Sequence, residues 1–207
     1  MKDLILKHKP QHVVECGALT GNNTKLLAEL RNEFPFKFTV ITDNEFSLDG
    51  VEVMRGISYK ALESMPDDSI DMCIIDTDHN YWTLTKELEA LNPKLRKDGI
   101  VCMHDINTFY HNTGVSIAYE NGDPYPLKEI EETGATHGSL GNAVIDFLHK
   151  HPFDYKLLRY SEESHGGLAI QKCMVKVLTY FATNRTSEVD DILKNRGAQW
   201  TEAKAAI

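Results

Sequence analysis

Short apolar segments alternate with helix-like segments through the first half of the chain, and Gly, Asn, Asp or Pro stands at most of the boundaries. The apolar runs predict buried strands, which we place at residues 12–16, 38–42, 51–54, 70–76 and 100–104. Strands that alternate with helices are typical of βαβ units, in which the strands are parallel. The pattern therefore predicts an α/β fold.

The helical segments show the periodicity of an element packed on a sheet. Residues 23–33 place Leu26, Leu27 and Leu30 on one face, and Pro35 ends that helix. A short helix is predicted around residues 59–64. A longer one spans residues 81–96, with an apolar face formed by Leu84, Leu88, Leu91 and Leu95. Asp98-Gly99 predicts the turn into the following strand.

The second half of the chain is less regular. Residues 107–138 are rich in Gly, Pro, Asn and Tyr and are too long for a routine connection, which favours a lid or binding loop. Ser139 predicts the N-cap of a helix that ends near His151, and a closing strand pair follows at residues 153–160 and 168–172. We expect one domain over residues 1–183 and a helical tail over residues 184–207.

Composition narrows the class of protein. The 207 residues carry a formal charge of −9 and are 42% hydrophobic, which excludes a disordered chain and gives no basic stripe for nucleic acid. The longest apolar stretches are far below the roughly 18 residues that span a bilayer. Four cysteines without a C-x-x-C motif indicate reduced core residues. We expect a cytoplasmic protein that binds neither membrane nor nucleic acid.

Acidic residues stand where the predicted parallel strands end, namely Glu15, Asp43 and Asp76. Ligands of open α/β sheets bind at that edge. The turn after the first strand contains Gly17 and Gly21, but it matches neither the phosphate-binding P-loop nor the dinucleotide G-x-G-x-x-G. A turn without phosphate-binding features suits a nucleoside. Asp43, about 20 residues further on, can accept hydrogen bonds from ribose hydroxyls; the alternative is that Asp43 only begins a turn.

Four segments together resemble the class I S-adenosylmethionine-dependent methyltransferases. They are VVECGALTG at 13–21, ITD at 41–43, SIDMCIIDTDHNY at 69–81 and LRKDGIVCMHDI at 95–106. In detail they are most similar to small O-methyltransferases with an Asp-x-Asp-His stretch and a later His-Asp-Ile. The resemblance implies a Rossmann-like, seven-stranded, mostly parallel sheet with helices on both faces and an antiparallel C-terminal strand.

The same resemblance implies a cofactor site for S-adenosylmethionine. Glu15 and Gly17 would line its methionine end, Asp43 would hold the ribose and Ser58 would lie near the adenine. For Ser58 the alternative is a helix N-cap. The expected cofactor-binding set is completed by Ala18, Gly21 and Asp76.

The resemblance also implies a site for a divalent cation such as Mg²⁺, which prefers oxygen ligands. Asp76 and Asp105 would bind the cation, and His79 would deprotonate the acceptor hydroxyl as general base. The residue before Asp105 is His104 rather than a second acid, so His104 is the candidate for the remaining ligand. The alternative for His79 is a surface or helix-capping residue.

These inferences favour an enzyme that transfers a methyl group from S-adenosylmethionine to a hydroxyl oxygen of a small molecule. Two other hypotheses stay open, namely a non-catalytic or degenerate domain that binds the cofactor and an iron-dependent hydroxylase of the same fold. The acceptor cannot be deduced from the fold. For the tail with Trp200, packing on its own domain is favoured over the alternative, a contact with the second subunit of a homodimer.

Overall fold

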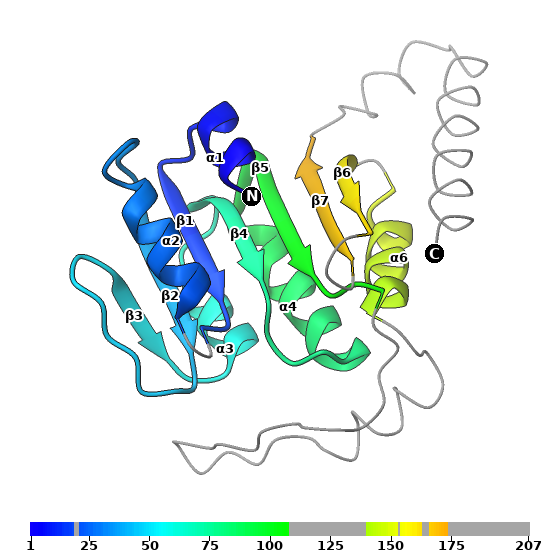
Figure 1. Cartoon of the computed structure of the whole chain (residues 1–207). Helices are drawn as coiled ribbons and strands as arrows, with labels where there is room; N and C mark the ends of the chain where they lie inside the picture. The colour runs from blue at the N-terminus through cyan, green and yellow to red at the C-terminus, as the bar shows by residue number, and fades with distance from the viewer. Residues whose placement is uncertain (19–20, 108–139, 153, 163–165, 174–207) are drawn as a thin grey trace. The chain divides into compact units, whose positions relative to one another are not determined.

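The sheet of this protein is built from strands of both halves of the chain. The structure is a computed structural model that describes residues 1–18, 21–107, 140–152, 154–162 and 166–173. Within them a seven-stranded sheet has the order β3-β2-β1-β4-β5-β7-β6 (Figure 1). Its strands are β1 (His12–Cys16), β2 (Lys37–Thr42), β3 (Glu52–Arg55), β4 (Ile70–Ile75), β5 (Leu95–His104), β6 (Tyr155–Ser161) and β7 (Gly167–Lys172). Strands β1 to β5 pair in parallel, whereas β7 is antiparallel to both β5 and β6. The predicted fold class is confirmed.

Helices cover both faces of this sheet (Figure 1). The described helices are α1 (Lys2–His8), α2 (Asn22–Leu30), α3 (Ser58–Ser64), α4 (Tyr81–Lys94) and α6 (Leu140–Lys150). Residues of α1 and α2 share one apolar cluster with alternate residues of the strands, for example Ile5 and Leu27 with Val13 and Phe38. On the other face, α4 packs against α3 and α6. Because both faces are covered, β1 is buried at every position and β4 at every position except Asp71, which explains their nearly continuous apolar sequences.

Several predicted ends are shifted by one or two residues, for example that of the helix at 81–96, which ends at Lys94, and three differences are larger. Helix α1 was not predicted; it is short and buries only Ile5. Helix α2 ends at Leu30, and residues 31–33 continue as turns. Strand β5 begins at Leu95, so the predicted turn at Asp98-Gly99 is wrong. Instead, Asp98 has a φ of 64° and lies where the pairing with β4 shifts, which makes this segment a bulge inside the strand.

The strand order places a crevice at the carboxyl ends of the central strands. From β1 the chain continues through β2 to β3 on one side, and then through β4 to β5 on the other. Ligands of open α/β sheets bind where the strand order reverses in this way. Two backbone hydrogen bonds extend the pairing beyond the strands, from Gly17 N to Ile41 O and from Asp76 N to Cys16 O, both 2.9 Å long. These bonds hold the turn after β1 beside the residue that follows β4.

Two predicted features lie outside the described residues. They are the binding loop at 107–138, of which only Asn107 is described, and the tail at 184–207 with Trp200. All described residues belong to a compact unit, Met1–Cys173. None of the helices in the described part of the chain is long and apolar enough to cross a membrane.

Candidate active site

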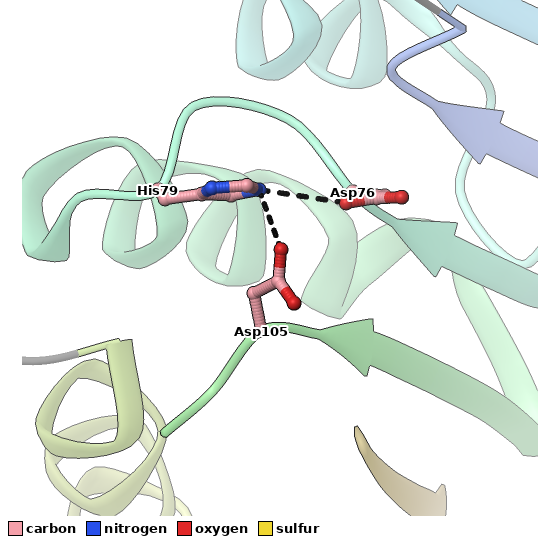
Figure 2. Close-up of side chains that lie close together, drawn as sticks. All are labelled: Asp76, His79 and Asp105. Carbon is pink, nitrogen blue, oxygen red and sulfur yellow. Dashed lines mark ion pairs between the residues drawn. The ribbon is translucent and has the colours of Figure 1, made fainter. Parts of the chain in front are cut away.

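A histidine and two carboxylates meet at the carboxyl edge of the sheet. Figure 2 shows the ring of His79 directed toward Asp76, with the carboxylate of Asp105 approaching from the neighbouring strand. His79 Nε2 lies 3.5 Å from Asp76 Oδ1 and 3.2 Å from Asp105 Oδ2. The side chains of Asp76 and Asp105 are 26% and 12% exposed, so much of this charge is shielded from water. The structure thus brings together three residues that the sequence places near the ends of adjacent strands.

The local backbone explains why these side chains converge. Asp76 directly follows β4, and His79 directly precedes Asn80, the N-cap of α4. The Asn80 side chain accepts a hydrogen bond of 2.8 Å from Thr83 N, which fixes the start of that helix. Asp105 follows β5 with a φ of 55°, a left-handed conformation that Asp tolerates better than most residues. This conformation turns the chain sharply at the point where the carboxylate enters the site.

His104 adds a fourth polar group. Its Nδ1 lies 2.9 Å from Asp105 Oδ1 and 3.6 Å from Asp76 Oδ1. Nevertheless His104 Nδ1 and Asp105 Oδ1 are both buried, and neither makes a hydrogen bond of acceptable geometry with the residues that the structure describes. Both atoms could instead coordinate a metal ion. Ligand atoms of Asp76, His79 and Asp105 lie within 4.8 Å of one another. Buried nitrogen and oxygen atoms that lack hydrogen-bond partners, beside two carboxylates, fit a site for a divalent cation.

The charges of the site shift two pKa values. The neighbouring carboxylates raise the pKa of His79, first through the hydrogen bond with Asp76, while burial opposes this effect. Burial raises the pKa of Asp78 to about 6, and the negative charge of Asp43 acts in the same direction. His79 is therefore a stronger base than an isolated histidine.

The turn after β1 depends on glycine at two positions. Gly17 has a φ of +90°, and a Cβ atom there would lie 2.0 Å from the carbonyl oxygen of Asp76. Gly21 has a φ of +68°, and its Cβ would lie 2.5 Å from the ring of Phe46. Ala18 is only 4% exposed. The backbone of this turn is thereby held against the site, as close approach to a ligand requires.

Glu15 is the most deeply buried acid of the predicted cofactor set, at 1% exposure. Burial raises its pKa to about 7, and the charge of Asp76 adds to this increase, whereas Thr24 opposes it. Among the described residues, its Oε2 is buried and has no hydrogen-bond partner of acceptable geometry. A carboxyl in this state would be stabilised strongly by a cationic group.

The remaining two predicted cofactor residues lie in different surroundings. Asp43 directly follows β2 and is partly buried. It lies near enough to Asp78 for its negative charge to raise the pKa of Asp78. Ser58 is the first residue of α3, and its hydroxyl donates a hydrogen bond to Glu87 Oε1. The Ser58 side chain is thus engaged within the protein.

Glu87 was missed by the sequence analysis. It is fully buried on α4 and lines the same pocket as Asp76, His79 and His104. Its position in the sequence carries a signal that could have been used: an ionisable residue interrupts the apolar face formed by Leu84, Leu88 and Leu91. Acids on such a face are rarely buried without a specific partner.

Comparisons with known proteins agree with this architecture. A family model described as a methyltransferase domain matches residues 14–106, somewhat less than half of the chain. No curated protein matches the sequence significantly. Among solved structures, a candidate caffeoyl-CoA O-methyltransferase from Staphylococcus aureus has a TM-score of 0.56 and 18% identity, over 83% of this chain and 80% of that one.

Two further structures are similar at the level of the fold. Methyltransferase PaMTH1 from Podospora anserina, bound to S-adenosylhomocysteine, has a TM-score of 0.54 and 13% identity, over 83% of this chain and 75% of that one. The MycE methyltransferase of mycinamycin biosynthesis, in complex with Mg, S-adenosylhomocysteine and mycinamycin VI, has a TM-score of 0.54 and 18% identity. That match covers 84% of this chain and 46% of the MycE chain. Residues 14–106 are therefore similar to a methyltransferase domain, within a chain that shares the fold of these methyltransferases.

Proposed function

We propose that this protein transfers a methyl group from S-adenosylmethionine to a hydroxyl oxygen of a small molecule, with a divalent cation bound at the acceptor side. The observation that carries the proposal is the convergence of His79, Asp76 and Asp105 next to the turn at Gly17. A base beside two carboxylates suits an acceptor that must lose a proton before it attacks a methyl group. The methyltransferase family match supports the reaction class.

The cofactor would lie across the carboxyl ends of β1, β2 and β4. Glu15 would face the methionine ammonium group, whose positive charge would favour the ionised form of this buried carboxyl. Asp43 would accept hydrogen bonds from the ribose hydroxyls, and the Gly17–Gly21 turn with Ala18 would allow close backbone approach. Ser58 would contribute near the adenine through its place at the start of α3. PaMTH1 and MycE were both solved with S-adenosylhomocysteine, which supports this cofactor.

Asp76 and Asp105 would hold the cation through carboxylate oxygens, with His104 Nδ1 as the third protein ligand. A bound cation of this kind lowers the pKa of a coordinated hydroxyl and stabilises the resulting alkoxide. His79 Nε2 would accept the acceptor's proton. The two carboxylates of this donor set suit Mn²⁺ as well as Mg²⁺.

The experiment is isothermal titration of the protein with S-adenosylmethionine and S-adenosylhomocysteine, each with and without Mg²⁺ or Mn²⁺. We expect micromolar binding that weakens at least tenfold in Asp43→Asn. The matched control is Asp49→Asn, an exposed acid of the same connection between β2 and β3, which should bind like wild type. Cation binding should be lost in Asp105→Asn.

An acceptor screen with methyl-labelled S-adenosylmethionine then tests the reaction itself. Transfer of label to a small hydroxyl compound, lost in His79→Ala, is the expected result. Cofactor binding without turnover of any acceptor would favour the non-catalytic domain. Absence of binding to either nucleoside would overturn the proposal, and a strict requirement for Fe²⁺ would favour the hydroxylase.

A further inference from the structure

Glu87 is a buried acid with no role in the proposed reaction. Its side chain is fully buried, and Oε1 accepts two hydrogen bonds, one from Ser58 Oγ and one of 2.7 Å from Thr77 Oγ1. The second oxygen, Oε2, is buried and makes no hydrogen bond in the described part of the protein. Burying a carboxyl is costly, and replacing it by an apolar residue would continue the apolar face of α4. Because burying this carboxyl costs free energy, we expect its two hydrogen bonds to have a role other than filling the core.

The two hydroxyls come from separate parts of the candidate site. Thr77 stands between Asp76 and Asp78 in the loop that leads to His79. Ser58 is the first residue of α3, on the side of the site expected to hold the adenine. Glu87 itself belongs to α4, so one carboxylate oxygen links three elements at a single point.

The loop from Asp76 to Asn80 is also held at other points, including the contacts of His79 with Asp76 and Asp105. Backbone hydrogen bonds run from Asp76 N to Cys16 O and from Asn80 N to Asp78 O. The first fixes the beginning of the loop and the second closes its end, whereas Thr77 is held through its side chain. The hydrogen bond to Glu87 therefore ties Thr77, next to the cation-ligand candidate Asp76, directly to α4.

We propose that Glu87 is a positioning residue, which fixes the loop carrying Asp76 and His79 to the first turn of α3 by accepting hydrogen bonds from Thr77 and Ser58. This inference rests on the proposed function, because it assigns to the loop the placement of a cation ligand and a base. Misplacement by about 1 Å is enough to impair a catalytic site. Burial raises the pKa of Glu87 to about 7, so a side chain that is neutral and still accepts both hydrogen bonds, such as Gln, should replace it well.

The first test is hydrogen exchange on the ligand-free protein. In Glu87→Leu and Thr77→Val, we expect backbone amides of residues 76–80 to exchange at least tenfold faster than in wild type. Glu87→Gln should stay within twofold. The matched control is Thr85→Val, because the Thr85 hydroxyl donates to the Tyr81 carbonyl of the same helix and not to Glu87.

The second test separates positioning from a purely structural role. Binding of Mn²⁺ and of S-adenosylhomocysteine is measured by titration well below the melting temperature of each variant. Thr77→Val should weaken Mn²⁺ binding at least fivefold, while Glu87→Gln and Thr85→Val bind like wild type. Should Glu87→Leu not fold, Thr77→Val and Ser58→Ala carry both tests.

Unchanged exchange in Thr77→Val would overturn the inference. Faster exchange with unchanged binding of both ligands would also overturn it, since Glu87 would then serve stability alone. If wild type bound neither Mn²⁺ nor S-adenosylhomocysteine, the proposed function would fail. The exchange result would still decide whether Glu87 fixes the loop.

Discussion

At the scale of single residues, Glu87 makes the stability of the protein depend on pH. Burial raises its pKa to about 7 from an ordinary value of 4.5, against the hydrogen bonds from Ser58 and Thr77. The folded protein therefore holds this proton more tightly than the unfolded chain does. The resulting stabilisation is complete below about pH 4.5 and is lost as the pH rises through about 7.

We expect wild type to lose on the order of 2 kcal/mol more stability than Glu87→Gln between pH 5 and pH 8. Urea unfolding of both proteins across this range measures the difference, and comparing them cancels the similar contribution of Glu15. Glu63→Gln, at an exposed position, should follow wild type. Parallel curves for wild type and Glu87→Gln would contradict the raised pKa.

Gly17 offers a second prediction at this scale. In Gly17→Ala, a Cβ atom placed 2.0 Å from the Asp76 carbonyl oxygen would force the turn and β4 apart, so we expect a loss of about 3 kcal/mol or more. Gly50→Ala is the control, since its φ is +73° but its nearest neighbour is the flexible Arg31 side chain at 3.2 Å. That variant should lose only about 1 kcal/mol, the cost of a left-handed conformation. Denaturant unfolding measures both, and similar losses would show that the collision is relieved.

At the scale of elements, the start of α4 places His79. Asn80 caps this helix through Thr83 N, so Asn80→Ala should cost about 1 kcal/mol, whereas Asn80→Ser should retain most of the stability. The change in the free energy of unfolding is measured by thermal unfolding, with the same enthalpy of unfolding used for all variants. Faster amide exchange at the first turn of α4 in Asn80→Ala alone would locate the effect. Equal stability of the two variants would argue against the cap.

The sequence predicted elements well wherever burial imposes a pattern. Strand β1 was predicted with its observed ends, because it is buried at every position and is bounded by polar residues. Helix α1 was missed because seven residues with one buried side chain give no periodicity. The bulge in β5 was taken for a turn, since Asp98-Gly99 suits both and only pairing with β4 distinguishes them.

At the scale of the whole molecule, three cysteines lie buried on the adjacent strands β1, β4 and β5. They are Cys16, Cys73 and Cys102, whereas Cys173 is partly exposed. Burial raises the pKa of Cys102 to about 12, and a hydrogen bond with Cys73 together with burial raises that of Cys16. Thiols that are buried and protonated react only when the protein opens.

We therefore expect one thiol to react rapidly with a disulfide reagent and three to react at least 1,000-fold more slowly, at the rate of global unfolding. The reaction is followed by absorbance, and mass spectrometry identifies the fast site. Cys173→Ser should abolish the fast phase and leave the slow one unchanged. Rapid modification of Cys73 in the native protein would mean that the sheet opens locally.

The sequence predicted those residues of the candidate site that stand just after strands of the sheet. Strands that end at one edge bring their following residues together, which is why Asp76, His79, His104 and Asp105 could be grouped before their distances were known. Glu87 could not be grouped with them, because Ser58 and Thr77 reach it from separate elements. Contacts of this kind depend on how helices pack, and a single sequence does not encode that packing in any local pattern.

Ile106 is bonded to two residues that lie far from it in the sequence. Its carbonyl oxygen accepts a hydrogen bond from Gly141 N at 3.0 Å, and its N–H donates to Gly166 O at 3.4 Å. The described residues on either side of 108–139 are thus held close together, because Asn107 follows Ile106 and Leu140 precedes Gly141. A change in the number of residues between these two ends adds little closure entropy and shifts no strand register. We therefore expect insertions or deletions between these two ends to leave the hydrogen bonds of Ile106 and the neighbouring strands unchanged.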